Sequence, residues 1–177
     1  MEIKKIMVIG AGQMGSGIAQ VSAAAGYSVV LNDLNDGFVN RGLGIIQKNL
    51  EKDMNKGRIT EGQKAEIFGR VSPSTSLSDA SDCDFVIEAA IENMSIKSKI
   101  FSDLDSICPP HAILASNTSS LPITEIAAST KRPEKVIGMH FMNPVPVMKL
   151  VEVIRGLATL CIGGGQGTAM VVENIKE

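Results

Sequence analysis

A glycine-rich segment near the start of the chain has the spacing of a phosphate-binding loop. It reads GAGQMG from Gly10 and follows the GxGxxG pattern. Between a strand and a helix, Gly10 allows a tight turn, Gly12 lets a pyrophosphate approach the backbone, and Gly15 allows close packing of helix on strand. The amides at the helix start then face the anion. We therefore predict a dinucleotide site that Gln13 and Met14 also line.

An acidic residue stands where such a site needs one. Asp33 lies 21 positions after Gly12, at the end of a second apolar run. A carboxylate there can accept hydrogen bonds from the adenosine ribose hydroxyls and repels a 2′-phosphate, which favours NAD over NADP. The alternative is an ordinary tight turn in which Asp33 caps the next loop.

A histidine in the second half of the chain has the chemistry of a proton carrier. His140 is one of two histidines and stands at the end of an apolar run, before a turn bounded by prolines. Beside a bound nicotinamide, an imidazole can exchange a proton with a substrate oxygen while hydride moves to or from carbon. Glu152 is a candidate to orient that ring. Taken singly, His140 fits a structural histidine, Glu152 an edge carboxylate and Ser119 a helix cap.

The elements that must position these residues alternate along the chain. The predicted helices span 14–25 and 94–107, with a long one capped by Asn35 and a short one opened by a Thr60–Gln63 capping box. The segment 72–82 is interpreted as a polar connection. Strands are predicted at 5–10, 28–33, 85–89, 112–116, 136–140 and 150–154. This alternation predicts an α/β fold with a doubly wound, mainly parallel sheet. Ligands bind such sheets at the carboxyl ends of the strands, and the loops that carry Ser119 and His140 would lie at that edge.

Composition limits the classes of function. The chain has 177 residues, 44% of them hydrophobic, and a net charge of −2, which argues against a nucleic-acid partner. Its apolar runs are too short for a membrane span and its start lacks a signal-peptide layout, so the expected compartment is the cytoplasm. Three cysteines without ligand spacing suggest neither a zinc site nor a disulfide framework, and no metal is expected.

Two longer motifs carry a resemblance to a known family. With "ASNTSSLPI" and "HFMNPVPVMKLVEVI", residues 1–155 resemble the NAD-binding domain of the 3-hydroxyacyl-CoA dehydrogenase family, particularly its bacterial 3-hydroxybutyryl-CoA members. The resemblance implies a Rossmann-type fold, NAD as cofactor, and interconversion of 3-oxoacyl-CoA, such as acetoacetyl-CoA, and (S)-3-hydroxyacyl-CoA. It makes His140 the general acid/base, pairs it with Glu152, and places Ser119 at the substrate's 3-oxygen or the nicotinamide.

The same resemblance implies further contacts. Asn49 and Lys56 become candidates to bind the CoA moiety of an acyl-CoA substrate, from a helix face that also carries Lys48 and Lys52. By spacing alone these lysines form a solvated stripe. Around the nicotinamide and its ribose the resemblance places Glu92, Lys97, Asn117 and Asn143.

The end of the chain resembles a different family. Residues 156–177 contain "GLATLCIGGGQGTAMVVE", which is similar to the C-terminal end of thiolases, whereas the dehydrogenases normally continue into a helical domain that supplies an active-site asparagine and most of the dimer interface. The interpretation is a chimaeric junction, with a tail that is not a domain of its own. Strand-like segments 157–162 and 168–172 are predicted to form a hairpin that frays, adds to the sheet edge or swaps between chains.

Three functions remain open on the sequence. The first is the NAD-dependent dehydrogenase, with turnover impaired by the shortened chain. The second is an inert NAD-binding module, and the third is an interaction fragment that docks on a full-length enzyme. Apolar surface that the helical domain normally covers would be exposed here, which favours association into a homo-oligomer. The sequence does not indicate how its subunits pair.

Overall fold

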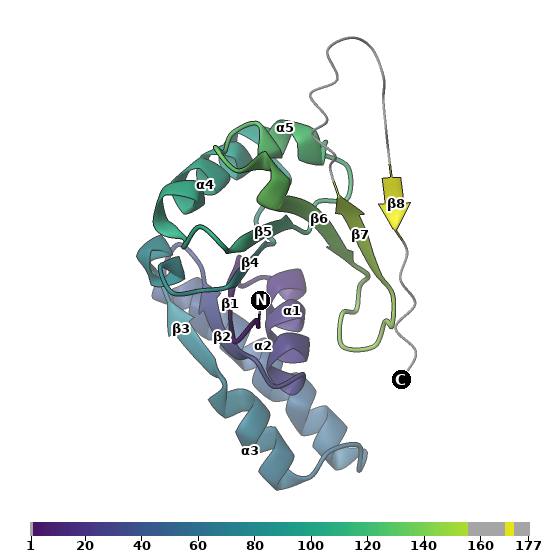
Figure 1. Cartoon of the computed structure of the whole chain (residues 1–177). Helices are drawn as coiled ribbons and strands as arrows, with labels where there is room; N and C mark the ends of the chain where they lie inside the picture. Colours follow the sequence, from purple (N-terminus) through teal and green to yellow (C-terminus); the bar gives the residue numbers. More distant parts are fainter. Residues whose placement is uncertain (1, 156–168, 172–177) are drawn as a thin grey trace.

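The computed structural model describes residues 2–155 and 169–171, which form one twisted sheet with helices on both faces (Figure 1). The described strands form an eight-stranded sheet in the order β3-β2-β1-β4-β5-β6-β7-β8. Neighbours from β3 to β6 pair in parallel, and β7 and β8 run antiparallel to their inner neighbours. The order 3-2-1-4-5-6 is that of a Rossmann-type sheet, as the sequence predicts.

The bounds of the elements are as follows. The strands are β1 Lys5–Ile9, β2 Ser28–Asn32, β3 Val71–Ser74, β4 Phe85–Glu88, β5 Ile113–Ser116, β6 Val136–Phe141, β7 Val151–Arg155 and β8 Ala169–Val171. The helices are α1 Gln13–Ala24, α2 Asp36–Asn55, α3 Glu61–Gly69, α4 Met94–Ile107 and α5 Ile123–Ala127, with short 3₁₀ turns at Leu77–Ala80 and Pro133–Lys135.

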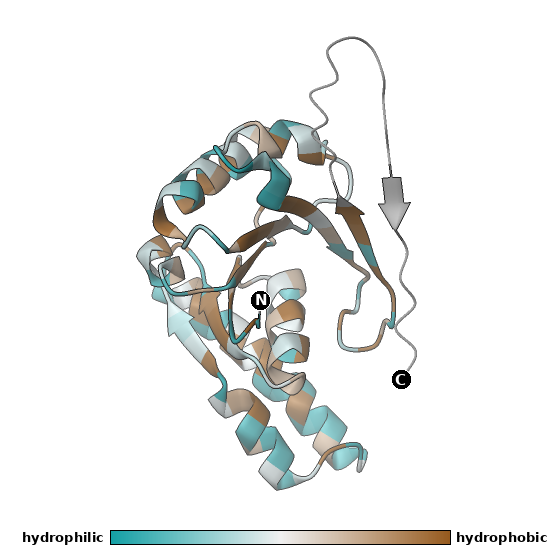
Figure 2. Ribbon diagram, viewed as in Figure 1, coloured by the Kyte–Doolittle hydropathy of each residue, from teal (hydrophilic) through white to brown (hydrophobic). Residues whose placement is uncertain are grey.

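Each central strand is apolar on both sides because helices cover both faces of the sheet. In β1, Ile6 and Val8 pack in the cluster under α1, α2 and α3, whereas Met7 and Ile9 pack in the cluster under α4 and α5. This period of two produces the continuous apolar runs of the sequence, visible as brown strands in Figure 2. The core is therefore two layers on either side of one sheet.

Local signals set the starts of α2 and α3 as predicted. The Asn35 side chain accepts a hydrogen bond from the Phe38 amide at 3.0 Å and begins α2. Thr60 and Gln63 form a reciprocal capping box at the start of α3. After α1, Gly26 takes a φ of +101°, a left-handed conformation that suits glycine. α4 spans the residues that the sequence predicts, and α5 was not predicted.

The prediction of a polar connection at 72–82 is wrong at its beginning. Val71–Ser74 form β3, which pairs in parallel with β2 at one edge of the sheet. Only Val71 and Ser74 of this strand are buried, so its two exposed positions, Ser72 and Pro73, hide it in the sequence. An edge strand tolerates a proline because one side of its backbone pairs with no other strand, so the missing N–H of proline costs no hydrogen bond there.

The other side of the sheet ends in an antiparallel addition. β6 and β7 pair with His140 directly opposite Glu152, and β8 pairs with β7 through Val171 opposite Val153. Of the outcomes expected for the tail, Ala169–Val171 adds to this sheet edge. The predicted strand 157–162 and the cysteine at 161 lie outside the described residues. The division at 155/156 into a domain and a thiolase-like tail stays a prediction.

The helices and the two described cysteines bear on two further predictions. Within the residues that the structure describes, no helix combines the length and apolarity needed to cross a membrane. Cys83 and Cys108 are buried free thiols, and burial raises the pKa of Cys83 to about 12 and that of Cys108 to about 11. Both thiols therefore stay protonated and unreactive near neutral pH.

Candidate functional site

A cavity of about 750 Å³ opens at the carboxyl ends of the central strands. Its walls come from the segments that follow β1, β2, β3 and β4, and from the first two turns of α2 and α4. β1 and β4 are neighbours in the sheet although β2 and β3 lie between them in sequence, so the crossovers on the two sides diverge at this point. Ligands of open α/β sheets bind in such a crevice. The volume is in the range of cofactor pockets.

The glycine loop has the geometry that its spacing predicts. Gly10 has a φ of +95°, and an added β-carbon would lie 2.6 Å from the Ala89 carbonyl oxygen. A β-carbon at Gly15 would lie 1.7 Å from the Gly10 oxygen, so α1 packs directly on the turn. At Gly12, apart from the adjoining backbone, no atom of the described residues lies within 4 Å of that position, and this residue is the N-cap of α1. The space beside Gly12 and the uncapped amides suit a pyrophosphate.

Asp33, directly after β2, lines the same cavity. Its Oδ2 accepts a hydrogen bond from the Ala11 amide at 2.7 Å, and Oδ1 accepts one from the Leu34 amide at 2.7 Å. The carboxylate thus braces the glycine loop and lines the cavity at once. Each oxygen keeps a second lone pair for a ribose hydroxyl. The two readings of Asp33, loop cap and ribose acceptor, are compatible.

Three predicted residues meet at the ends of β5, β6 and β7. The Nδ1 atom of His140 lies 3.0 Å from Glu152 Oε2, and its Nε2 atom lies 3.0 Å from the Ser119 hydroxyl. Because the carboxylate only accepts, Nδ1 carries the proton, and the neutral ring accepts from Ser119 through Nε2. Ser119 is exposed, and the side chains of His140 and Glu152 are 23% and 32% exposed, so the three residues lie at the surface of the protein.

Two amide side chains tie this cluster to the glycine loop. Asn117 Oδ1 accepts from the Phe141 amide at 2.8 Å, which joins the ends of β5 and β6. The Gln13 side chain donates to Asn143 Oδ1 at 3.0 Å, so a residue at the start of α1 meets the turn after β6. Both members of that second pair were predicted at the cofactor site; the structure brings them into contact, and Gln13 also lines the cavity. The turn contains a cis Asn143–Pro144 bond.

Glu92 holds the loop that carries Ser119. Its Oε1 accepts from the Thr118 hydroxyl and from the amides of Ser119 at 3.1 Å and Ser120 at 3.3 Å. Burial raises the pKa of Glu92, but these hydrogen bonds and the positive charge of Lys97 outweigh it, so the pKa lies below its usual value. The Glu92 carboxylate is therefore ionised in the folded protein near neutral pH.

Lys97 does not reach the cavity surface. It is 1% exposed, and its Nζ lies 2.7 Å from Glu88 Oε1 and 3.4 Å from Glu92 Oε2. Glu88, at 0% exposure, is a residue that sequence reasoning missed. Its signal was an acid at the end of the apolar run FVIE, a position that also suits an ordinary strand end.

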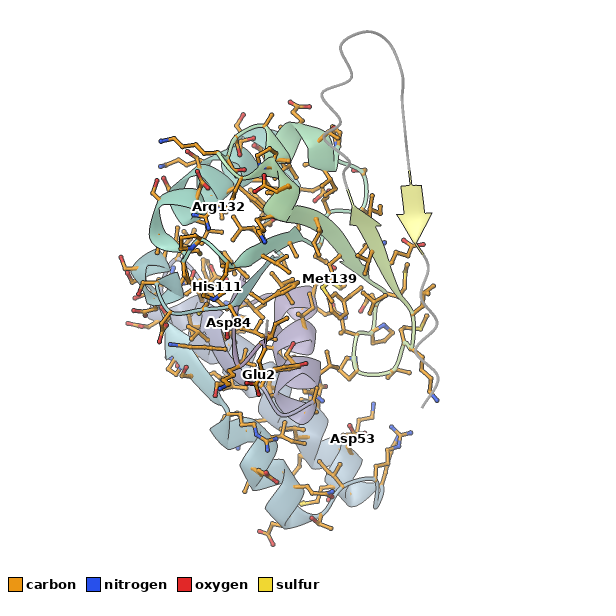
Figure 3. The ribbon with its side chains drawn as sticks, in the orientation of Figure 1. Glu2, Asp53, Asp84, His111, Arg132 and Met139 are labelled. Carbon is orange, nitrogen blue, oxygen red and sulfur yellow. The ribbon has the colours of Figure 1, made fainter. Side chains whose placement is uncertain are left out.

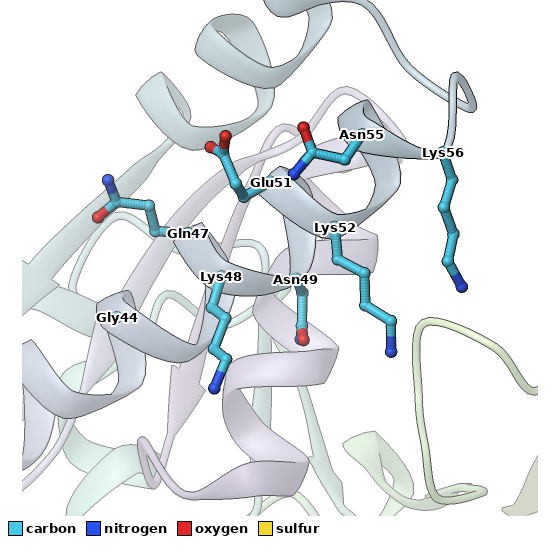
Figure 4. A pocket seen from close by; sticks show the side chains of 8 residues that line it. All are labelled: Gly44, Gln47, Lys48, Asn49, Glu51, Lys52, Asn55 and Lys56. Carbon is cyan, nitrogen blue, oxygen red and sulfur yellow. The ribbon is translucent and has the colours of Figure 1, made fainter.

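A second cavity, of about 660 Å³, lies against α2 (Figure 4). Asn49 and Lys56 both line it, and Lys48, Lys52 and Lys56 extend to the same side of the helix in Figure 4. The Asn49 amide already donates to Gln20 Oε1 at 3.1 Å, which joins α2 to α1. The structure therefore brings the predicted CoA candidates together on one face, away from the glycine loop.

Comparison with known proteins agrees with this geometry. A family described as "3-hydroxyacyl-CoA dehydrogenase, NAD binding domain" matches residues 5–160. A protein of Bacillus subtilis named "Probable 3-hydroxybutyryl-CoA dehydrogenase" is 62% identical over 90% of this chain and 55% of its own length. The chain thus spans about half the length of the curated relatives it matches.

Solved structures give the same relation. The (S)-3-hydroxybutyryl-CoA dehydrogenase from Ralstonia eutropha superimposes with a TM-score of 0.86 at 47% identity, over 88% of this chain and 55% of that one. The 3-hydroxybutyryl-CoA dehydrogenase from Escherichia coli K12 gives 0.87 at 42% identity, over 91% and 34%. With its matched residues, sheet order and glycine loop, the chain belongs to the 3-hydroxyacyl-CoA dehydrogenase family and carries its NAD-binding domain.

Proposed function

We propose that this chain supplies the NAD-binding and proton-transfer parts of an enzyme that interconverts 3-oxoacyl-CoA and (S)-3-hydroxyacyl-CoA. The observation that carries the proposal is the Glu152–His140–Ser119 row, with 3.0 Å at each contact, beside a glycine loop of dinucleotide geometry. A bound nicotinamide supplies the hydride acceptor or donor. The chain's own residues then have to hold the dinucleotide, orient the substrate and move one proton.

His140 is suited to move that proton in either direction. In reduction the protonated ring donates from Nε2 to the oxygen on which negative charge develops, and in oxidation the neutral ring accepts the proton back. Glu152 keeps the proton on Nδ1 and so leaves Nε2 as the atom that exchanges a proton with the substrate. The Ser119 hydroxyl, held on Nε2, lies where a substrate oxygen would also bind.

For the substrate we propose an acyl-CoA, with the CoA moiety against α2. Lys48, Lys52 and Lys56 give this helix face a cluster of positive charge suited to phosphate groups (Figure 4). Gln13 and Asn143 would lie near the nicotinamide, and their mutual hydrogen bond supports that placement. Assembly as a homo-oligomer stays part of the proposal.

The test measures binding and turnover separately. We expect the chain to bind NAD in calorimetry and to oxidise NADH with acetoacetyl-CoA. The His140→Ala variant should lose about 10²- to 10⁴-fold in turnover, the usual contribution of a general acid, and keep its NAD affinity. His111→Ala is the matched control, because this histidine contacts Asp84 instead.

Two outcomes would count against the proposal. Equal loss of NAD affinity and turnover in His140→Ala would show that the ring holds the dinucleotide rather than moving a proton. Full NAD binding with no turnover of the parent chain would favour the inert binding module. A partner that co-purifies in fixed ratio would favour the interaction fragment.

A further inference from the structure

A buried charge network connects the interior of the sheet to the Ser119 loop. We call it the Glu88 network: Glu88 at the end of β4, Lys97 in α4, Glu92 between them in sequence, and the hydroxyls of Ser116 and Thr118. Glu88 is 0% exposed to solvent and Lys97 is 1% exposed. Burying charges is unfavourable unless they are paired and hydrogen-bonded, so the network calls for a physical explanation.

Every contact of Glu88 points into the protein. Its Oε1 accepts from the Ala90 amide at 2.7 Å and from Lys97 Nζ at 2.7 Å. Its Oε2 accepts from the Ser116 hydroxyl at 2.7 Å and from the same Nζ at 3.0 Å. The carboxylate thus binds the ends of β4 and β5 and fixes the ammonium between them. One of these partners, Ala90, also lines the cavity beside the glycine loop.

Lys97 is shared unequally by its two carboxylates. Its Nζ lies 2.7 Å from Glu88 and 3.4 Å from Glu92, whose side chain is 41% exposed. Glu88 takes both short contacts of the ammonium, and Lys97 meets Glu92 only at the longer Oε2 contact. The other oxygen of Glu92, Oε1, accepts from the amides of Ser119 and Ser120. Those contacts place the Ser119 hydroxyl 3.0 Å from His140 Nε2.

We propose that Glu88 is a positioning residue for the reacting imidazole. Through Lys97 it sets where Glu92 lies, and Glu92 sets where the Ser119 hydroxyl meets His140. Without the charge on Glu88, Lys97 would draw Glu92 toward itself and away from the 118–120 loop. The consequence for turnover rests on the function proposed above, whereas the geometric coupling can be tested in the chain without turnover.

The experiment uses nitrogen NMR of the intact chain, with ¹⁵N in the histidine rings, near pH 8. Only two histidines are present, and His111 lies against Asp84 near the opposite ends of the strands, so it is an internal reference (Figure 3). Loss of the Ser119 hydrogen bond in Ser119→Ala should move the His140 Nε2 resonance. Glu88→Gln keeps the side chain's size and removes its charge.

We expect Glu88→Gln to move the His140 Nε2 resonance in the direction of Ser119→Ala, with the His111 resonances unchanged. Added to Ser119→Ala, Glu88→Gln should move it no further, because the coupling runs through the missing hydroxyl. Ser116→Ala, which removes one hydrogen bond to Glu88, should give a smaller movement in the same direction.

Asp105→Asn is the control for a purely structural role. It weakens another ion pair of α4, with Arg132 at 2.7 Å, and should leave His140 unchanged. An unmoved Nε2 resonance in Glu88→Gln, or an equal movement with and without Ser119, would overturn the proposal. So would loss of the fold in both Glu88→Gln and Ser116→Ala, since the network would then support the core rather than the loop.

Discussion

His140 depends on two neighbours that come from different elements. Glu152 lies directly opposite it in the β6–β7 ladder, and Ser119 approaches from the loop after β5. The register of the sheet sets a cross-strand pair, so the β6–β7 ladder holds Glu152 directly opposite His140. The Ser119 contact is set by hydrogen bonds to Glu92 and is the more easily perturbed of the two.

At Asp33 we predict a change in cofactor preference. Asp33→Ala removes the proposed ribose acceptor and a negative charge and also frees the Ala11 amide. NAD affinity should fall about tenfold, the equivalent of roughly 1.4 kcal/mol, and NADP affinity should fall less or rise. Calorimetric titration with both cofactors measures the ratio. An unchanged ratio would show that the carboxylate acts only as the brace of the glycine loop.

At the scale of elements, the site is formed by residues at the carboxyl ends of several strands. The carboxyl ends of β1, β2, β4, β5 and β6 all open on one edge, so residues far apart in sequence converge there without a shared motif. The packing of α1 on the turn after β1 is what brings the dinucleotide loop to that edge. Gly12 and Gly15 of this loop have different physical roles, and substitutions can distinguish them.

We predict that Gly12→Ala and Gly15→Ala fail in different ways. At Gly15 a β-carbon would lie 1.7 Å from a backbone oxygen, so the variant should lose about 3 kcal/mol of stability. At Gly12 the space is open, so stability should change by less than about 1 kcal/mol while NAD affinity falls at least about tenfold. Urea unfolding and NAD titration separate the two effects. Equal destabilisation by both variants would contradict this account of the loop.

The secondary structure was predictable where local rules decide it. The caps at Asn35 and Thr60 and the positive φ at Gly26 follow from residue type alone. β3 was missed because an edge strand needs few apolar residues, and Ser72 and Pro73 look like a loop. Glu88 was missed because its partner Lys97 lies nine positions away, in a helix whose packing on β4 the sequence does not reveal.

Across the whole molecule, a second cluster holds the opposite ends of the strands together. Asp84 Oδ2 accepts from the amides of Lys4 and Lys5 at 2.8 and 3.1 Å, and Oδ1 contacts His111 at 2.9 Å. The Lys4 amide first, then His111 and the Lys5 amide, lower the pKa of Asp84 to about 2. The beginnings of β1 and β4 are thereby tied to the segment before β5.

We predict that this cluster makes stability depend on acid pH. A carboxyl whose pKa is lower in the folded than in the unfolded state stabilises the fold above the unfolded value, 3.8, and loses that contribution as pH falls through about 2. At pH 7, Asp84→Asn should cost about 1.5 kcal/mol, the low end for hydrogen bonds to a charged group. The difference from the parent should shrink between pH 4 and pH 2.

Thermal or urea unfolding at a series of pH values provides the measurement. Asp103→Asn is a suitable control, since that carboxylate pairs with Lys99 on the exposed surface of α4. Surface pairs of this kind contribute little, so the control should unfold like the parent throughout the range. A constant difference for Asp84→Asn from pH 7 to pH 2 would show that the lost stability is unrelated to its charge.

The Gln13–Asn143 hydrogen bond joins residues 130 positions apart, and this separation has a consequence for synthesis of the chain. At about 5 to 20 residues per second, the glycine loop leaves the ribosome roughly 7 to 26 seconds before its partner is made. For that interval the glycine loop lacks the turn after β6 that it contacts in the folded chain. Because the cavity is lined by residues up to Ile100, its last wall is made only about 2 to 9 seconds before Asn143, so the cavity and its link to β6 are completed close together.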